Sequence, residues 1–173
     1  MNWNIDPAHT TASFTVRHLA ITNVRGSFSN VSGSITTDDA GRPTQITASI
    51  PVDTITTGQP DRDGHLKSPD FFNATDHSHI TFEGGDVKDI GGGEYDIGGT
   101  LTMHGESRPV TLRTEVSAPV TDPMSGGRKI GAEATVQLSR KDFGLTWNVA
   151  LEAGGVMVSD TVKVHLEIQA AQG

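Results

Sequence analysis

Short stretches of alternating apolar and polar residues recur along this chain, separated by turn-forming residues, and no long helical pattern interrupts them. In Thr11–His18, for example, Ala12, Phe14, Val16 and His18 share one face. Such alternation is typical of a half-buried β-strand. The repetition of this pattern predicts an all-β protein, built as a sandwich or as a closed antiparallel barrel of about eight strands.

One expected strand contains a slip in its alternation. In Val24–Thr37 the apolar residues change parity near Ser29 and Asn30, so we expect a β-bulge that bends a single strand there. His104-Gly105-Glu106 predicts a tight hairpin turn between two further strands. The expected strands are Thr11–His18, Val24–Thr37, Thr44–Val52, His79–Glu83, Tyr95–Met103, Pro109–Val116, Ile130–Leu138 and Val156–Ile168.

The stretch Asp61–Phe72 departs from this pattern. It reads D-R-D-G-H-L-K-S-P-D-F-F and has no alternation, while Gly64 and Pro69 punctuate it. We expect one or two short helical turns inside a long connection, which in a compact β-domain is usually functional or disordered. The adjacent Phe71 and Phe72 argue against disorder, so the stretch is interpreted as a lid or plug at one end of a barrel. A second short turn is expected at Arg140–Gly144.

The inward faces of the expected strands carry many small residues. These are Gly26, Gly33, Gly99, Ala12, Ala48, Ala132 and Ala134. Small side chains on an apolar face leave room, which favours an internal cavity over a solid core. The alternative is that small residues fit the taper of a filled barrel.

Composition limits the partners. The formal net charge of −8 argues against nucleic acid or an anionic membrane as a partner, since both need basic patches. The chain has no cysteine and no apolar run of membrane-span length, so we expect no disulfide and no stable membrane insertion. We expect one domain over residues 1–173. No leader pattern follows Met1, which predicts a cytoplasmic protein if Met1 is the native start, and a periplasmic or secreted one if a leader has been removed.

Seven separated motifs together resemble one known family. They are WNIDPAHT at Trp3–Thr10, FTVRHL at Phe14–Leu19, VRGSF at Val24–Phe28, RDGHLKSPDFF at Arg62–Phe72, LTMHG at Leu101–Gly105, RPVTL at Arg108–Leu112 and RKDFG at Arg140–Gly144. The chain is similar, from Trp3 to about Ile168, to the YceI family of bacterial polyisoprenoid-binding proteins. Thr10, where the family often has Ser, and Asp76–His79, where a Tyr-Pro type sequence is common, depart from its pattern.

The resemblance implies a lipocalin-like, eight-stranded antiparallel β-barrel with a long isoprenoid or similar amphiphile in its interior. We therefore predict a binding protein that sequesters or transports a polyprenyl, quinone-like or related lipid, without catalysis and without a metal or other cofactor. The family often forms dimers, and an exposed strand would support a homodimer. The residues expected to bind the lipid in an apolar tunnel are Phe14, Val16, His18, Phe28, Ile50, Arg62, His65, Leu66, Phe71, Phe72, Phe82, Leu101, Met103, Phe143 and Trp147.

The polar candidates have two interpretations each. Arg62, Asp63 and His65 would meet a polar head group at the mouth of the tunnel, or Arg62 and Asp63 would fix the lid by ion pairing. Arg140 and Asp142 have the same two interpretations. Arg17, Arg25 and Arg108 sit beside inward residues and are expected to point outward.

Other functions receive weaker support. His77 and His79 would face one side of an early-starting strand, but two His without a third ligand are a weak zinc signal. No catalytic or phosphate-binding motif is present. Two alternatives stay open: an isomerase-like or cyclase-like enzyme that uses the barrel cavity, and a ligand-free interaction module, which exposed edge strands or an apolar surface patch would favour.

Overall fold

The computed structural model of the protein describes residues 1–173. It contains one helix, α1 (Pro60–Lys67), and short 3₁₀ turns at Pro7–His9, Val52–Thr54 and Arg140–Phe143. No helix has the length and apolar character that crossing a bilayer requires. The strands are β1 (Asn2–Ile5), β2 (Thr11–His18), β3 (Thr22–Phe28), β4 (Ser32–Thr37), β5 (Pro43–Pro51), β6 (His79–Gly91), β7 (Glu94–Met103), β8 (Glu106–Val116), β9 (Val120–Thr121), β10 (Arg128–Ser139) and β11 (Val158–Gln172).

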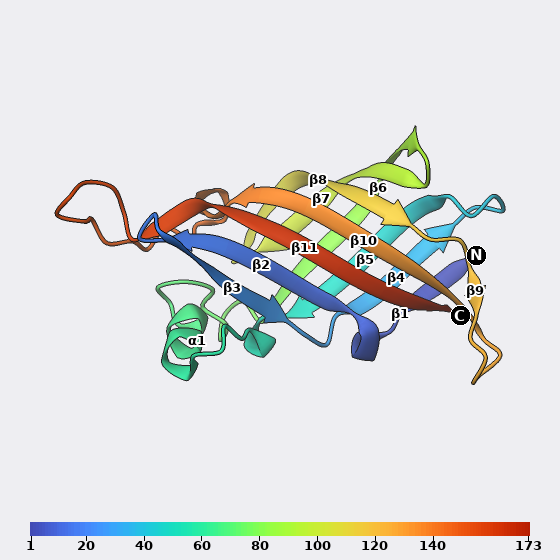
Figure 1. Ribbon diagram of the computed structural model, residues 1–173, viewed down its shortest axis with the longest axis horizontal. Coiled ribbons are helices and arrows are strands. Elements are labelled where there is room, and N and C mark those ends of the chain that lie inside the picture. Colours follow the sequence, from blue (N-terminus) through green and yellow to red (C-terminus); the bar gives the residue numbers. More distant parts are fainter.

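The strands form one antiparallel sheet that closes into a barrel (Figure 1). The sheet order is β3-β2-β11-β1-β4-β5-β6-β7-β8-β10-β9, and a further pairing of β11 with β10 closes the ring. The closed ring therefore contains eight strands: β11, β1, β4, β5, β6, β7, β8 and β10. This confirms the antiparallel eight-stranded barrel that the alternation and the family resemblance predicted.

The long strand β11 organises the two ends of the barrel differently. Its first part pairs with β2, through Val162 opposite Val16, and its last part pairs with β1, through Ala170 opposite Ile5. β1 and β2 thus pair one after the other with the same edge of β11. β3 pairs with β2, whereas β4 pairs with β1 and β5. The ring is therefore closed around β1 and β4, while at the other end the long connection 52–78, which contains α1, fills the space beside β3.

The expected single strand Val24–Thr37 is wrong in one respect. The structure breaks it into β3 and β4, and Asn30 in the break has a left-handed backbone with φ 56°. The change of parity is resolved not by a bulge within one strand but by a change of partner strand. The strand β1 was not predicted, because its four residues are too few for alternation to be recognised.

The closed end of the barrel is filled by side chains. Trp3, Ile35 and Ile97 are almost completely buried there, and the Trp3 indole donates a hydrogen bond of 2.9 Å to the Thr37 hydroxyl. A Cβ on Gly99 would overlap the backbone of Glu83 and Gly84 on the neighbouring strand and would lie 2.7 Å from the ring of Phe82. The missing side chain thus makes room for an aromatic ring. At this end the expectation that small inward residues indicate a cavity is wrong.

Candidate functional site

A cavity of about 250 Å³ lies at the opposite end of the barrel, where β2 and β3 pair alongside the first part of β11. Residues of β2, β3, the first half of β11, α1 and the segment 138–147 surround it, and 14 of its 20 lining residues are hydrophobic. This composition suits an apolar ligand with few polar contacts.

The alternation of the strands forms one wall of this cavity. Phe14 and Val16 on β2 stand opposite Val164 and Val162 on β11, and Val24 on β3 stands opposite Val16. All five side chains line the cavity. Every second side chain of a strand points to the same face of the sheet. Each of these strands therefore places a row of apolar side chains on the inner side.

The segment before α1 is fixed by a network of hydrogen bonds. The Gln59 side chain caps α1 by accepting a bond of 2.6 Å from the Arg62 amide. The Arg62 guanidinium donates to the hydroxyl of Thr57 at 2.7 Å and to its carbonyl at 3.0 Å. The Thr57 amide and hydroxyl in turn donate to the Asp63 carboxylate. Arg62 and Asp63 therefore hold the base of the lid through Thr57, and not through the ion pairing that was expected.

The same network shifts the ionisation of Asp63. Desolvation disfavours its charged form, but the hydrogen bonds from the Thr57 hydroxyl and amide outweigh that effect, so the pKa of Asp63 lies below its usual value. The carboxylate is consequently charged under neutral conditions and able to accept both bonds.

An aromatic cluster closes the cavity beside α1. The rings of His65 and Trp147 pack edge to face with centroids 4.8 Å apart, and Phe71 lies 5.1 Å from His65 and 5.3 Å from Trp147. The Nε2 atom of His65 lies 2.8 Å from the Asp70 carboxylate. These contacts join α1 to the segment that follows β10, so the two turn segments singled out in the sequence meet at one place.

Arg140 connects that segment to the beginning of β11. Its side chain is only 4% exposed, and its guanidinium donates hydrogen bonds to the backbone carbonyls of Leu145, Trp147, Val158 and Ser159 at 2.6 to 3.3 Å. Burial lowers the pKa of Arg140 below its ordinary value. Four carbonyl partners satisfy this group, which supports its structural interpretation over binding of a head group.

The register of β11 explains why Asp160 interrupts the apolar residues on one face of this strand. The pairing with β2 is irregular between Val158 and Val162, and Asp160 lies within this irregularity. Its carboxylate lies 3.2 Å from the Lys141 ammonium and 3.7 Å from the Arg140 guanidinium. Asp160 thus points toward these two cations.

The structure brings ten of the predicted ligand-binding residues to this cavity. They are Phe14, Val16, His18, Arg62, His65, Leu66, Phe71, Phe72, Met103 and Trp147. Their role in binding stays a prediction.

Five predicted residues lie elsewhere. Phe28 packs behind the wall, against the rings of Phe14 and Phe72. Phe28 and Phe143 belong to one cluster of buried residues, in which Phe143 is only 1% exposed, and Ile50 packs against this cluster. Phe82 belongs to the core of the closed end, and Leu101 packs against that core. Alternation identifies the face on which a residue lies but not its position along the barrel axis. These five residues are not among those that line the cavity, and their role in binding stays a prediction.

Ten lining residues were absent from the list of predicted lipid-binding residues, although Arg140 was a candidate for contact with a polar head group. They are Arg17, Val24, Thr57, Leu138, Arg140, Leu145, Met157, Val158, Val162 and Val164. Val158, Val162 and Val164 could have been found from the sequence, because they share one face of the last expected strand with other apolar residues. In the structure this strand, β11, pairs with β2, whose inner face was predicted to bind the lipid. Arg17 is exposed, as expected of an outward side chain, and borders the rim of the cavity.

His77 and His79, which were considered as a possible metal-binding pair, do not lie on the same strand. The strand begins at His79, whereas His77 belongs to the preceding turn, in which its amide bonds to the Asn73 carbonyl. The His77 ring packs against His104, with centroids 5.1 Å apart, and His79 contacts the Ser78 hydroxyl. No group of three or more His, Cys, Asp or Glu side chains is placed to hold a metal ion.

These features define a class: a lipocalin-like, closed antiparallel barrel with an apolar cavity at one end. The sequence matches the YceI-like domain family over residues 3–170, and the chain belongs to that family. The UPF0312 protein SA2479 of Staphylococcus aureus is 34% identical over 163 residues, which is 94% of this chain and 92% of that protein. A UPF0312 protein of Vibrio cholerae, VC_A0539, is 31% identical over 80% of this chain and 73% of its own length.

Solved structures share the fold. BcnA of Burkholderia cenocepacia superposes with a TM-score of 0.81 at 20% identity, over 96% of this chain and 99% of BcnA. The YCEI protein of Campylobacter jejuni gives a TM-score of 0.76 at 28% identity, over 91% of this chain and 90% of that chain. A domain from Saccharophagus degradans, described as polyisoprenoid-binding, gives 0.75 at 17% identity, over 99% and 98% of the two chains.

Proposed function

We propose that this protein binds a long isoprenoid-type lipid, such as a polyprenyl, quinone or similar amphiphile, and that it sequesters or carries this lipid without catalysis. The observation that supports the proposal most directly is the apolar cavity between β2, β11, α1 and the segment 138–147. The S. degradans domain of the same fold is described as polyisoprenoid-binding, which directs the choice of ligand to test.

The energetics suit a flexible apolar chain. Each buried methylene contributes about 0.8 kcal/mol, so a tail segment of a few isoprene units provides ample driving force. Apolar burial has no preferred direction, which makes the identity of the tail loosely specified. The packed core around Trp3, Ile35 and Ile97 limits the depth of the site. The end of the tail is thus held in the cavity, and the rest extends toward the rim.

The polar residues at the cavity support binding rather than catalysis. Arg62 bonds to Thr57, His65 pairs with Asp70, and Arg140 donates to four backbone carbonyls. Their hydrogen bonds hold the walls in place. Arg17, Arg62 and His18 lie on the lining and are the groups nearest to a polar head that stays at the rim.

The proposal is tested by organic extraction of the purified protein followed by mass spectrometry. We expect a prenyl lipid or related amphiphile in the wild-type extract, or its uptake after incubation with prenyl lipids. Phe72→Asp places a charge in the apolar wall and is expected to abolish retention. Val120→Asp is the control, because Val120 is an exposed apolar residue of β9, away from the cavity. An empty wild-type extract together with no uptake would contradict the proposal.

A further inference from the structure

Two neighbouring segments form an exposed apolar surface at the end of the barrel that holds the cavity. The connection from β10 to β11 extends beyond the barrel as a narrow loop, beside the turn between β2 and β3 (Figure 1). The Leu19 amide donates a hydrogen bond of 2.8 Å to the Met157 carbonyl and so joins the two. We call Leu19–Ile21 together with Val149–Met157 the apolar tip.

The apolar tip exposes large side chains and almost no charge. Ile21 is 69% exposed, Val149 41% and Val156 46%. Glu152 is the only charged residue between Gly144 and Ser159. Isolated exposed apolar residues are ordinary on protein surfaces, but a contiguous group of them marks an interaction site.

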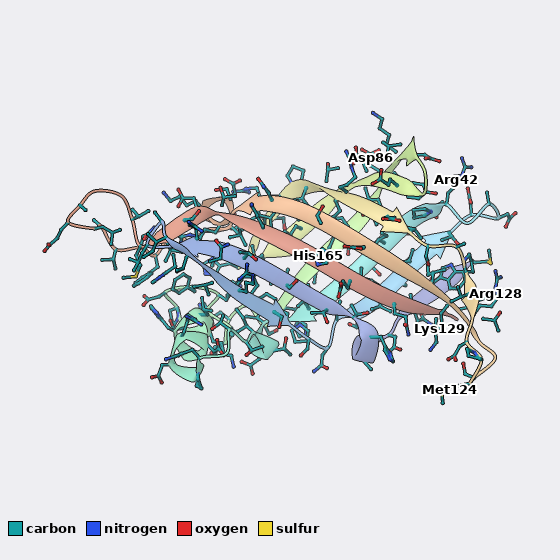
Figure 2. All side chains as sticks on the ribbon, in the orientation of Figure 1. Arg42, Asp86, Met124, Arg128, Lys129 and His165 are labelled. Carbon is teal, nitrogen blue, oxygen red and sulfur yellow. The ribbon has the colours of Figure 1, made fainter.

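The opposite end of the barrel has a different character. It also exposes large apolar residues, Met124 among them at 96%, but Arg128 and Lys129 lie nearby (Figure 2). There Lys129 pairs with Asp122 at 2.9 Å. The apolar tip therefore has exposed apolar side chains with one charged residue among them, whereas the exposed Met124 at the opposite end lies near cations.

The backbone of the turn also points to a role for its apolar residues. Leu19 and Ala20 have left-handed conformations, with φ of 53° and 56°. Such turns favour Asn and Gly, because residues with a Cβ meet steric resistance there. Strained backbone retained at an exposed turn is a reason to look for function.

The tip is continuous with the cavity. Met157 belongs to the tip and also lines the cavity. Val158 and His18, which follow and precede residues of the tip in the sequence, line the cavity as well. The apolar tip therefore borders the proposed lipid site directly, through Met157.

We propose that the apolar tip docks on the surface of a lipid bilayer, with its side chains among the acyl chains at the interface. The inference that cargo is exchanged there rests on the proposed function; the docking itself does not. Charge identifies the type of surface, since the tip carries only Glu152 and the whole chain has a net charge of −8. The attraction is therefore hydrophobic, and zwitterionic lipid should bind at least as well as anionic lipid.

Vesicle flotation with the full chain tests this inference. We expect the wild type to float with phosphatidylcholine vesicles, no more weakly than with mixed phosphatidylcholine and phosphatidylglycerol vesicles, and without loss at high salt. Ile21→Asp and Val156→Asp should each lower vesicle affinity about tenfold or more, because each places a charge where an exposed aliphatic side chain would enter the bilayer. Met124→Asp, the matched control at the far end, should leave affinity unchanged.

A second measurement separates this inference from the proposed function. Uptake of a fluorescent polyene fatty acid in vesicle-free solution should persist in Ile21→Asp, while Phe72→Asp should lose uptake and still float. A wild type that takes up the probe but does not float overturns the docking and leaves the proposed function standing. A wild type that floats but takes up neither this probe nor prenyl lipid contradicts the proposed function alone. An equal loss of flotation in Met124→Asp, or a dimer without flotation that Ile21→Asp dissociates, also overturns the docking.

Discussion

At the scale of single residues, Arg140 contributes most to the shape of the site. It is 4% exposed and bonds to four backbone carbonyls, two in the segment after β10 and two in β11. Arg140→Met removes a donor from each of these carbonyls, and only the Val158 carbonyl keeps another side-chain donor, the Asn148 amide at 2.8 Å. We therefore expect the free energy of unfolding to fall by about 3 kcal/mol. Urea denaturation measures this change. Arg25→Met, on the exposed side of β3, is the control and should change it by less than about 0.5 kcal/mol; equal losses would contradict the role of Arg140.

The contact between Gly26 and Phe14 gives a second prediction at this scale. A Cβ on Gly26 would overlap the Phe14 ring, which lines the cavity. Gly26→Ala should therefore push the ring into the cavity, reduce lipid uptake and lower the free energy of unfolding by about 1–3 kcal/mol. Gly64→Ala in α1 meets nothing within 4 Å and should instead add about 0.5–1 kcal/mol with uptake unchanged. Undiminished lipid uptake in Gly26→Ala would show that the ring has another way to move.

At the scale of elements, the base of α1 should loosen in acid. The pKa of Asp63 lies below its usual value in the folded state, because hydrogen bonds from the Thr57 hydroxyl and amide outweigh desolvation. Its stabilising effect is therefore present above the unfolded pKa of about 3.9 and is lost as pH falls through the folded value. Thr57→Val removes one donor, raises the folded pKa and should move the loosening to higher pH.

Trp147 reports on this change, because it packs on His65 of α1. Its fluorescence, measured in a Trp3→Phe background from neutral pH into acid, should shift at higher pH in Thr57→Val than in the unsubstituted protein. Identical acid transitions in the two proteins would contradict the proposed link between Asp63 and the lid.

Local sequence signals predicted most elements of the fold. Alternation located β2, β5, β7, β8, β10 and β11, because half-buried strands show their inner face directly. The lack of alternation in Asp61–Phe72 identified the lid. The division of Val24–Thr37 into β3 and β4 depends on which strands pair with each half, and a local pattern does not contain that information.

The site was predicted in part for the same reason. Phe14 and Val16 could be assigned to an inner face from alternation alone. Phe82 has the same signal but lies toward the closed end, and its ring occupies space left by Gly84 and Gly99. Arg140 was recognised as a candidate, but only the structure shows that backbone carbonyls satisfy it.

At the scale of the whole molecule, the two ends of the barrel differ in packing. Eleven buried residues, including Trp3 and Ile97, form the core of the closed ring. The other end contains the cavity, the aromatic cluster of His65, Phe71 and Trp147, and the apolar tip. We therefore expect the barrel to have one mouth and a ligand to enter from that end only.

The most direct test of this account is the position of a bound prenyl lipid, measured by intermolecular nuclear Overhauser effects to methyl-labelled protein. We predict effects from the lipid tail to the methyl groups of Val162, Val164 and Leu66, which line the cavity, and none to Ile35 or Ile97 in the closed end. Effects confined to Val120 and other methyl groups on the outer surface would contradict the account, since they would place the lipid outside the barrel.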